Sequence, residues 1–479
     1  MTSILGYIGL GGKTTEPKKA ALPSTTSLFK EKTVGLEDLS NLSYSVLLAM
    51  KVSMSKLGDY EYQRVQTAIK QCRKRTFQED LKEEVCEQTH QGFLTLDQMK
   101  DNIRKNGKDF TTLTLNDLDD ELITIIRTFC PNLIELKIHP RADKFETMKF
   151  TDEGLANIAN LKNLSKLEIN YWCSPNLSPE GYFTLLSDKS LQARLTVLKI
   201  TSVAIIDSTL PLIENFSRLE KLKLQSCFLT TAGLLTLKLS STVHELDLVQ
   251  ATSMSVVAFD DRVLEHFASY TGLRSLSIGG DYQTATSKVT DQGIIKLLTC
   301  LFQLTQLTWN DYPFSLAIMK HLPETLRSFT VGNLSGNFYE TGLLEFCKKA
   351  THLTSLTIGS CGEEGLGSNV LSKLPRTLTH LYFGNVGFDK LTGLPSGLKY
   401  LAINGSTRIT PSQFAELSKL QLTTLRLINC PTLNDESLPG MFDGILSNSI
   451  ETLEIYNASI TGLSLDILVT LRTLRNLML

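Results

Sequence analysis

The chain of 479 residues contains no Cys-x-x-Cys pair, and its nine cysteines are an odd number spread at irregular intervals. A disulfide framework needs paired cysteines, and a zinc site needs cysteine or histidine ligands at short, regular spacings. The sequence therefore predicts neither. Unpaired cysteines persist as reduced thiols in a cytosol-like compartment, so we expect a cytoplasmic protein.

Long apolar runs are also missing. No stretch of about 18 apolar residues exists, so the sequence predicts no membrane span. The apolar residues 1–12 lack a basic segment before them, which argues against a secretory signal. Thr2 stands where N-myristoylation requires glycine, so a lipid anchor of that kind is not expected.

Neither sign of charge dominates. Lysine and arginine number 48 against 50 aspartate and glutamate residues, which gives a net charge of −2 and an isoelectric point of about 6.4. Nucleic-acid-binding domains are usually strongly basic. We therefore expect no nucleic-acid partner.

Catalytic patterns are absent as well. The seven histidines form no His-Glu-x-x-His motif or triad-like arrangement. Acid pairs such as Asp119-Asp120 and Asp260-Asp261 fall at expected helix starts, where capping explains them better than acid–base chemistry. We predict no catalytic residue, no metal ligand and no cofactor.

Residues 6–14 look at first like a phosphate-binding loop. The P-loop pattern Gly-x-x-x-x-Gly-Lys-Ser/Thr would end at Lys13 and Thr14, but its first glycine falls on Tyr7. Too few residues precede this segment to form a strand, and Pro17 interrupts the helix that should follow. Nucleotide hydrolysis through Lys13 therefore ranks third among the functional hypotheses.

What the sequence does contain is a repeated phrase, Leu-x-x-Leu-x-Leu, from about residue 110 to the last residue. There are 15 candidate copies, with start-to-start spacings from 20 residues (378 to 398) to 31 (133 to 164). A period in this range is typical of a solenoid. The copies start at Phe110, Leu133, Leu164, Leu195, Leu219, Val243, Leu273, Leu304, Leu326, Leu353, Leu378, Leu398, Leu422, Ile450 and Leu474.

The last two apolar residues of each phrase lie two apart, so they face the same side of a strand. One repeat cannot bury that face alone, and stacked neighbours must cover it. We therefore predict an α/β solenoid with a curved parallel sheet inside and helices outside. The predicted domains are a flexible tail (1–34), a helical N-terminal region that caps the array (35–106) and a repeat domain of about 15 repeats (107–479).

Helix starts are predicted by a second phrase. Thr151, Ser178, Thr230 and Thr290 each precede a Gly-apolar pair, as in Thr-Asp-Glu-Gly-Leu. Threonine or serine at these positions should cap the first helical turn. An acid or proline follows without cost, because the helix N-terminus favours both.

Together the two phrases resemble the cysteine-containing, or GALA-like, class of leucine-rich repeat. Cys227, Cys361 and Cys430 follow the strand phrase where that class places its cysteine. The resemblance implies a structural role for them, as small buried side chains in the turn. It implies a leucine-rich repeat fold over roughly three quarters of the chain.

Three repeats depart from this class. In these repeats the strand phrase is preceded by the motif Leu-Pro-x-x-Leu, at residues 322–326, 374–378 and 394–398. This motif resembles the shorter repeats of bacterial secreted effectors. We expect their outer helices to be reduced to irregular stretches.

Cysteine-containing repeats often follow an F-box in ubiquitin-ligase adaptors. Residues 42–48 and 71–75 echo an F-box, but its proline is absent and Arg75 occupies the tryptophan position. We therefore favour an unrelated helical cap that covers the exposed first repeat, and keep the F-box as the alternative. The F-box alternative would imply a Skp-type adaptor as a partner.

The side chains that flank the buried leucines should line the concave face. They are charged in the early repeats, small and hydroxyl-bearing in the middle, and aromatic at the end. Tyrosine and arginine are enriched in binding hot spots. We therefore predict a protein-contact patch at His380, Tyr382, Tyr400, Asn404, Arg426 and Tyr456.

Two alternatives stay open for this face. Exposed tyrosines suit β-structure even where no ligand binds. Lys166, Lys199, Lys221 and Lys223 could receive an acidic segment or phosphate, or could simply pair with neighbours such as Glu168 and Glu220. The function predicted overall is noncatalytic protein binding by the concave face, in a bacterial effector acting on a host protein in the host cytosol or, alternatively, in an F-box-like ubiquitin-ligase adaptor.

Overall fold

The computed structural model describes residues 95–140, 149–170, 176–249, 259–279, 288–310, 314–333, 339–360, 368–384, 388, 390–405, 408–461 and 464–479. The predicted tail, most of the predicted helical region, the P-loop-like and F-box-like segments and Cys361 lie outside these residues. The description below concerns the remainder.

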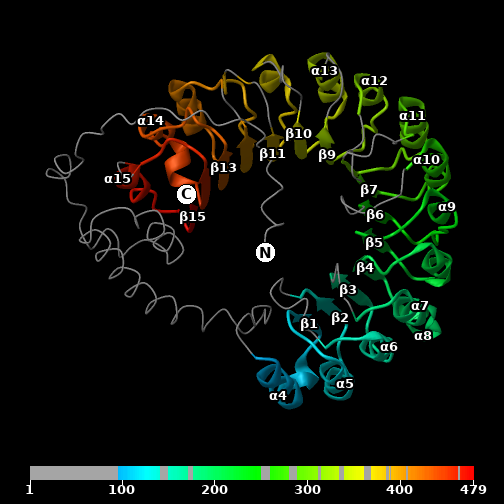
Figure 1. Cartoon of the computed structure of the whole chain (residues 1–479). Helices are drawn as coiled ribbons and strands as arrows, with labels where there is room; N and C mark the ends of the chain where they lie inside the picture. The colour runs from blue at the N-terminus through cyan, green and yellow to red at the C-terminus, as the bar shows by residue number, and fades with distance from the viewer. Residues whose placement is uncertain are drawn as a thin grey trace, which may run out of the picture.

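Every one of the fifteen phrases forms a strand. Within the described residues, fifteen parallel strands make one sheet whose spatial order follows the sequence from β1 to β15. Figure 1 shows them along the inner side of an open arc, with the helices outside. The predicted fold class, an α/β leucine-rich repeat solenoid, is confirmed.

The strands are β1 (Thr112–Leu115), β2 (Glu135–Ile138), β3 (Lys166–Asn170), β4 (Val197–Thr201), β5 (Lys221–Gln225), β6 (Glu245–Val249), β7 (Ser275–Gly279), β8 (Gln306–Trp309), β9 (Ser328–Asn333), β10 (Ser355–Ser360), β11 (His380–Gly384), β12 (Tyr400–Asn404), β13 (Thr424–Ile428), β14 (Thr452–Tyr456) and β15 (Asn476–Met478).

The α-helices are α4 (Leu96–Asn106), α5 (Asp120–Phe129), α6 (Asp152–Ala159), α7 (Pro179–Ser187), α8 (Lys189–Arg194), α9 (Thr231–Leu234), α10 (Asp261–Phe267), α11 (Asp291–Cys300), α12 (Leu316–Met319), α13 (Tyr339–Lys349), α14 (Ser437–Met441) and α15 (Leu465–Leu468). The 3₁₀ helices are η3 (Gly107–Asp109), η5 (Asp207–Asn215), η6 (Ser368–Lys373), η7 (Pro411–Lys419) and η8 (Ile445–Asn448).

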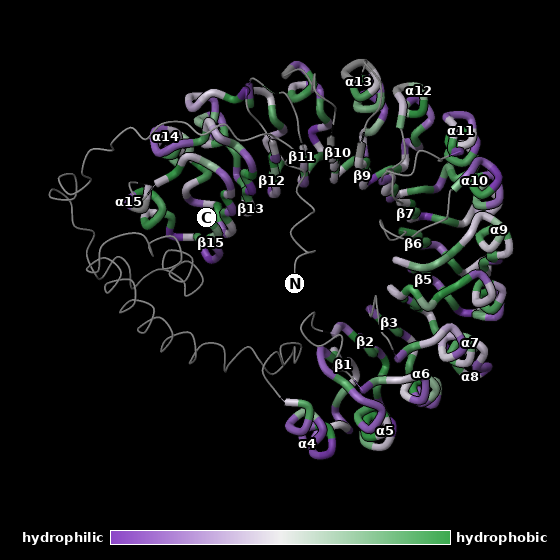
Figure 2. The backbone as a smooth tube through the Cα atoms, in the orientation of Figure 1, coloured by the Kyte–Doolittle hydropathy of each residue, from purple (hydrophilic) through white to green (hydrophobic). Residues whose placement is uncertain are grey.

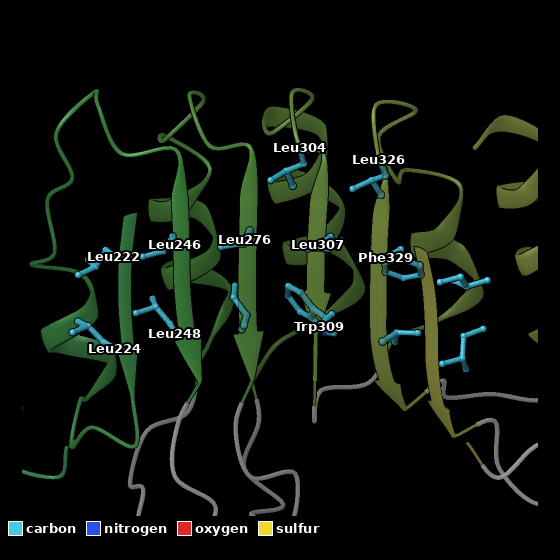
Figure 3. Close-up of a cluster of buried hydrophobic side chains, with 14 of the residues drawn as sticks. Leu222, Leu224, Leu246, Leu248, Leu276, Leu304, Leu307, Trp309, Leu326 and Phe329 are labelled. Carbon is cyan, nitrogen blue, oxygen red and sulfur yellow. The ribbon is translucent and has the colours of Figure 1, made fainter. Parts of the chain in front are cut away.

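The core lies between the sheet and the outer helices. Leu136, Leu167 and Leu198 are register partners on successive strands and are fully buried. Figure 3 shows the same stacking of leucines farther along the array, where Trp309 and Phe329 replace two of them. In Figure 2, hydrophobic residues recur in every coil. Burial of each such leucine stabilises the fold by about 1.5–3 kcal/mol. Because the leucines of one repeat are covered by those of the next, the repeats are stable only when they are stacked.

The predicted helix caps are confirmed. Thr151, Ser178, Thr230 and Thr290 are the N-caps of α6, α7, α9 and α11, and each side chain accepts a hydrogen bond from a first-turn backbone N–H. Such a cap contributes about 1 kcal/mol because it satisfies a donor that the helix itself cannot.

The acidic pairs have a more complex role than predicted. Asp119 and Asp260 cap α5 and α10 as expected. Asp120 and Asp261, however, reach the next repeat, where their carboxylates accept hydrogen bonds from the backbone N–H and hydroxyl of Thr151 and Thr290. Capping of their own helices is therefore the wrong explanation for these second acids.

The same link recurs as an Asp–Thr/Ser ladder from repeat to repeat. Asp152 binds Ser178, Asp207 binds Thr230 and Asp435 binds Thr461. The glycine of the helix-start phrase makes room for it. A Cβ added at Gly181 or Gly233 would overlap the carboxylate from the preceding repeat.

The Leu-Pro repeats have reduced outer layers, as predicted. Only the four-residue α12 precedes Leu322, and the 3₁₀ helix η6 precedes Leu374. Between β11 and Leu394 the described residues include no helix. The intervening repeat keeps α13, with 11 residues. Reduced outer layers also occur outside the Leu-Pro units, as in the four-residue α9 and the 3₁₀ helices η5 and η7.

At the N-terminal end of the described chain, α4 packs against α5. It buries Met99 and Ile103, and its buried Lys100 donates to Asp119 at 2.7 Å and to Glu121 at 2.5 Å. The helix thus covers the first repeat. Among all the described helices, none has the length and apolarity that crossing a membrane requires.

Candidate functional site

The inner face of the sheet carries three rows of side chains. In each strand, residues that flank the two buried positions point away from the core, one before, one between and one after them. We call these the first, middle and third rows. In-register pairing aligns them along the arc, so that Glu135, Lys166 and Val197 follow one another in the first row.

On β2–β6 the middle row and, except for Val197, the first row are charged, and opposite charges pair. Glu168 accepts from His139 at 2.9 Å and from Lys199 at 3.4 Å. Burial alone would raise the pKa of Glu168, but Lys199 and His139 lower it below its ordinary value. The carboxylate is therefore held ionised among its partners.

The four predicted lysines lie on this charged stretch. Lys221 pairs with Glu245 at 2.8 Å, and Lys223 pairs with Asp247 at 3.1 Å. With Lys199 on Glu168, three of them are paired within the sheet, although Glu220 is not one of the acids used. Lys166 has no carboxylate within ion-pair distance among the described residues. This arrangement favours the alternative of simple surface pairing for Lys199, Lys221 and Lys223.

The middle of the inner face, on β7–β10, carries no charged side chain in its described rows. The middle row consists of Ser277, Thr308, Thr330 and Thr357, and the first row of Ser275, Gln306, Ser328 and Ser355. In the part of the chain that the structure describes, only Ser275 and Gln306 among these bond to each other, at 3.3 Å. The other hydroxyls can donate to and accept from a bound molecule.

Glycines occupy most of the third row in this region. Gly359 and Gly384 follow Gly332 on successive strands, and a Cβ at either position would overlap the carbonyl oxygen of the preceding glycine. The row is therefore required by the close approach of the strand ends. It also means that Gly279, Gly332 and Gly359 add no side chain to the third row there, beside the small side chains of the first and middle rows.

Beyond the glycines, β11–β14 bring the predicted aromatic residues together. His380 and Tyr400 are register partners whose rings stack, with centroids 5.8 Å apart and planes 21° apart. His380 is exposed and Tyr400 partly so. Tyr382 lies beside them in the middle row, separated from Arg426 by Ala402.

Arg426 connects three strands of this group. Its Nη1 donates to the hydroxyl of Tyr400 at 3.3 Å, and its Nε donates to Glu454 at 2.6 Å. The Tyr400 hydroxyl and then the Glu454 carboxylate raise the pKa of Arg426 above its ordinary value, so the guanidinium is charged at any physiological pH. The contacts fix the positions of both the arginine and the tyrosine.

Asn404 and Tyr456 complete the predicted patch in the third row. The Asn404 amide donates to the hydroxyl of Tyr382 at 3.5 Å, and its oxygen accepts from Asn429 at 2.8 Å. Tyr456 donates to the sulfur of Met478 at 3.1 Å. All six residues therefore belong to one surface, which we call the aromatic patch: His380, Tyr382, Tyr400, Asn404, Arg426 and Tyr456.

Two residues of this surface were not in the predicted patch. Glu454 is almost buried yet anchors Arg426, and Ala402 lies on the inner face but is covered, because Tyr382 and Arg426 flank it in the same row. Strand alternation puts both on this face, but only the register between strands identifies their neighbours.

The turn cysteines have the structural role that the resemblance implied. Cys227 and Cys430 are buried, and each thiol lies against the carbonyl two residues earlier, at 3.2 and 3.5 Å. Burial raises the pKa of Cys227 to about 12. Over the described residues, no three His, Cys, Asp or Glu side chains group closely enough to hold a metal ion.

Comparison with known proteins yields no family model and no curated relative that matches the chain. Solved structures are similar at low identity. An internalin of Listeria monocytogenes is 17% identical, with a TM-score of 0.36, over 78% of this chain and 88% of its own. A chain of the yeast Rad7–Elc1 complex is 16% identical, with a TM-score of 0.45, over 85% and 95%.

A third structure, the leucine-rich repeat-containing protein LegL7 of Legionella pneumophila, is 13% identical, with a TM-score of 0.31, over 68% of this chain and 92% of its own. Similarity at this level carries no argument about function.

Proposed function

We propose that this chain is a noncatalytic scaffold that binds a protein partner through its inner face, with the aromatic patch as the main contact. The observation that carries the proposal is the Arg426–Tyr400–Glu454 connection beside the stacked His380. Tyrosine and arginine are prominent in hot spots, and side chains already held in place lose little freedom when a partner binds.

The rest of the inner face supports a protein rather than a polyanion. The cations of β3–β5 are largely neutralised by Glu168, Glu245 and Asp247. The uncharged hydroxyls of β7–β10 offer hydrogen bonds without a desolvated charge, which suits the polar backbone of a docked segment. A partner spanning β7–β14 would therefore meet a polar centre and an aromatic end.

A more specific proposal concerns the biological setting. The Leu-Pro repeats with their reduced outer layer favour a bacterial effector that binds a host protein, because that is the class whose repeats they resemble. The F-box-like alternative would place a Skp-type adaptor on residues 35–90, outside the described residues. Capture of a purified Skp-type adaptor by the full chain, lost on deletion of residues 35–90, would favour the adaptor role instead.

Affinity capture with mass spectrometry tests the main proposal. The triple variant Tyr382→Ala, Tyr400→Ala and Arg426→Ala should lose the captured partner, with binding weakened by about 2 kcal/mol or more, since hot-spot truncations reach this size. The control is Phe183→Ala, Phe302→Ala and Ile445→Ala, three exposed apolar residues outside the three inner rows. Equal capture by wild type and the patch variant, both folded, would refute the proposal.

A further inference from the structure

A second charged surface lies outside the inner face, in the turns that lead into β9–β12. Six exposed cations lie in these turns or at the ends of the helices that enter them, α13 and η6, and we call them the basic edge: Arg327, Lys348, Lys349, Lys373, Arg376 and Lys399. The turns belong to four consecutive repeats. Because all strands are parallel and in sequence order, these turns lie along one lateral edge of the solenoid.

The basic edge is not neutralised by its surroundings. Within the described turns, residues 320–327, 348–354, 373–379 and 394–399, the only acid is Glu324. None of the six cations has a carboxylate within ion-pair distance among the described residues. Lys320 nearby does pair with Glu345, at 3.9 Å, and Lys399 donates to the Gln421 side chain at 3.1 Å.

The cations of the basic edge differ from the cations of the inner face. Lys199, Lys221 and Lys223 each meet an acid on their own or a neighbouring strand. Neighbouring strands lie about 4.8 Å apart, so Arg327 and Lys399, three strands apart in register, are separated by about 15 Å. With a screening length near 8 Å, the fields of the cations between them overlap, and the edge attracts anions as a unit.

We infer that the basic edge binds an acidic segment of the protein partner, one that carries several aspartate or glutamate residues. The inference rests on the proposed function, because it assigns a second contact to the same partner. The two surfaces are continuous: Lys399 directly precedes Tyr400, and Thr379, in the turn after Arg376, directly precedes His380. One partner can therefore cover the edge and the aromatic patch together.

The composition of the edge favours an acidic protein segment over other anions. Single-stranded nucleic acids are held by aromatic side chains that stack on the bases, and membrane surfaces by apolar side chains that insert. The described residues of these turns include no phenylalanine, tyrosine or tryptophan, and their leucines are buried except for the partly buried Leu394. These four turns thus offer charge without a base-stacking or lipid-inserting side chain of their own; the exposed Phe302, whose carbonyl accepts from Thr325, belongs to the turn before them, and the aromatic patch lies on the adjoining strands.

The test uses the full chain and a fluorescein-labelled peptide of glutamates, about 12 residues long, followed by fluorescence anisotropy at about 50 mM salt, where screening is weak. The variant reverses four charges: Lys348→Glu, Lys349→Glu, Lys373→Glu and Arg376→Glu. The control reverses four other exposed cations, at Lys162, Lys189, Arg218 and Lys288. The total change in charge is identical in the two proteins.

We expect the edge variant to bind the peptide at least about tenfold more weakly, because four attractive contacts become repulsive, and the control to change less than about threefold. Equal weakening in the two variants would overturn the inference. Tighter binding of a single-stranded oligonucleotide, or of phosphatidylserine vesicles, than of the peptide would also overturn it, in favour of those ligands.

The experiment separates this inference from the proposed function. The variant Tyr382→Ala, Tyr400→Ala and Arg426→Ala keeps the basic edge, so it should still bind the peptide while losing the captured partner. If the edge variant binds the peptide normally and the patch variant still loses its partner, the inner-face proposal stands and the edge inference fails.

Discussion

The carboxylate of Asp152, in the first turn of α6, accepts two hydrogen bonds from Ser178, the N-cap of α7 in the next repeat. The backbone N–H of Ser178 lies 2.9 Å from one oxygen and its hydroxyl 2.6 Å from the other. Gly181 leaves the space that this carboxylate occupies. One side chain thus joins two repeats and orients the cap of the second helix.

This arrangement predicts the effect of Gly181→Ala. Alanine is the better helix former by about 1 kcal/mol, but its methyl group must displace the Asp152 carboxylate, and overpacking costs about 1–3 kcal/mol. We expect a net loss of stability in urea denaturation. The matched control is Gly272→Ala, where the nearest atom lies 3.9 Å from the added carbon and little change is expected.

A double-mutant cycle checks the cause. In an Asp152→Ala background the carboxylate is gone, so Gly181→Ala should cost at least about 0.5 kcal/mol less than in the wild type. Additive losses would show that the glycine serves another purpose.

Acid should destabilise the repeats through two aspartates, Asp435 of the ladder and Asp260, the N-cap of α10. Burial alone would raise the pKa of Asp435, but hydrogen bonds from Ser464 and Thr461 lower it. The pKa of Asp260 is likewise lowered, by Arg262 and backbone N–H groups, against the effect of burial. A lowered folded-state pKa contributes stability that is full above the ordinary value of 3.8 and is lost as pH falls through the folded value.

The measurement is the free energy of unfolding between about pH 6 and pH 2, where such carboxylates titrate. Asp435→Asn should flatten the acid limb of this curve relative to wild type, while Asp466→Asn, at an exposed acid in the first turn of α15, should leave it unchanged. An unchanged slope for Asp435→Asn would contradict the assignment.

Lys100→Met should loosen the first described helix. The ammonium is buried between Asp119 and Glu121, and its loss leaves Asp119 without its cation, while Glu121 keeps Arg104 at 3.3 Å. We expect the free energy that protects α4 from opening to fall by about 1–3 kcal/mol. This loss is smaller than for a fully buried ion pair, because Glu121 is largely exposed. Hydrogen exchange with mass spectrometry over residues 96–106 measures it, and Lys105→Met, on an exposed lysine, is the control. Equal exchange in both variants would refute the role of Lys100.

The buried cysteines should resist alkylation in the folded protein. Burial raises the pKa of Cys227 and Cys347 to about 12 and that of Cys130 to about 11, so their thiolate fraction at neutral pH is negligible. Iodoacetamide followed by peptide mass spectrometry should find all three unmodified in native buffer and modified in guanidinium. Rapid native modification of Cys227 would show that its turn opens.

The prediction of the site from sequence had a clear limit. The spacing of the phrases was enough to place Tyr382, Tyr400 and Arg426 on the same face, because side chains alternate along a strand whatever its neighbours are. It was not enough to pair them. Lys221 meets Glu245 rather than Glu220, and Arg426 meets Glu454, because the partner of each residue depends on which strand positions lie side by side.

The sequence by itself determined the solenoid, its strands and its helix caps, since each follows from local periodicity and from the bonding needs of a helix start. Only the tertiary structure decided what connects one repeat to the next. Asp152 reaches Ser178 across 26 positions of sequence, and Gly359 leaves room for a carbonyl of the preceding strand. Such contacts depend on how closely two coils stack, which is a property of packing and not of any local sequence pattern.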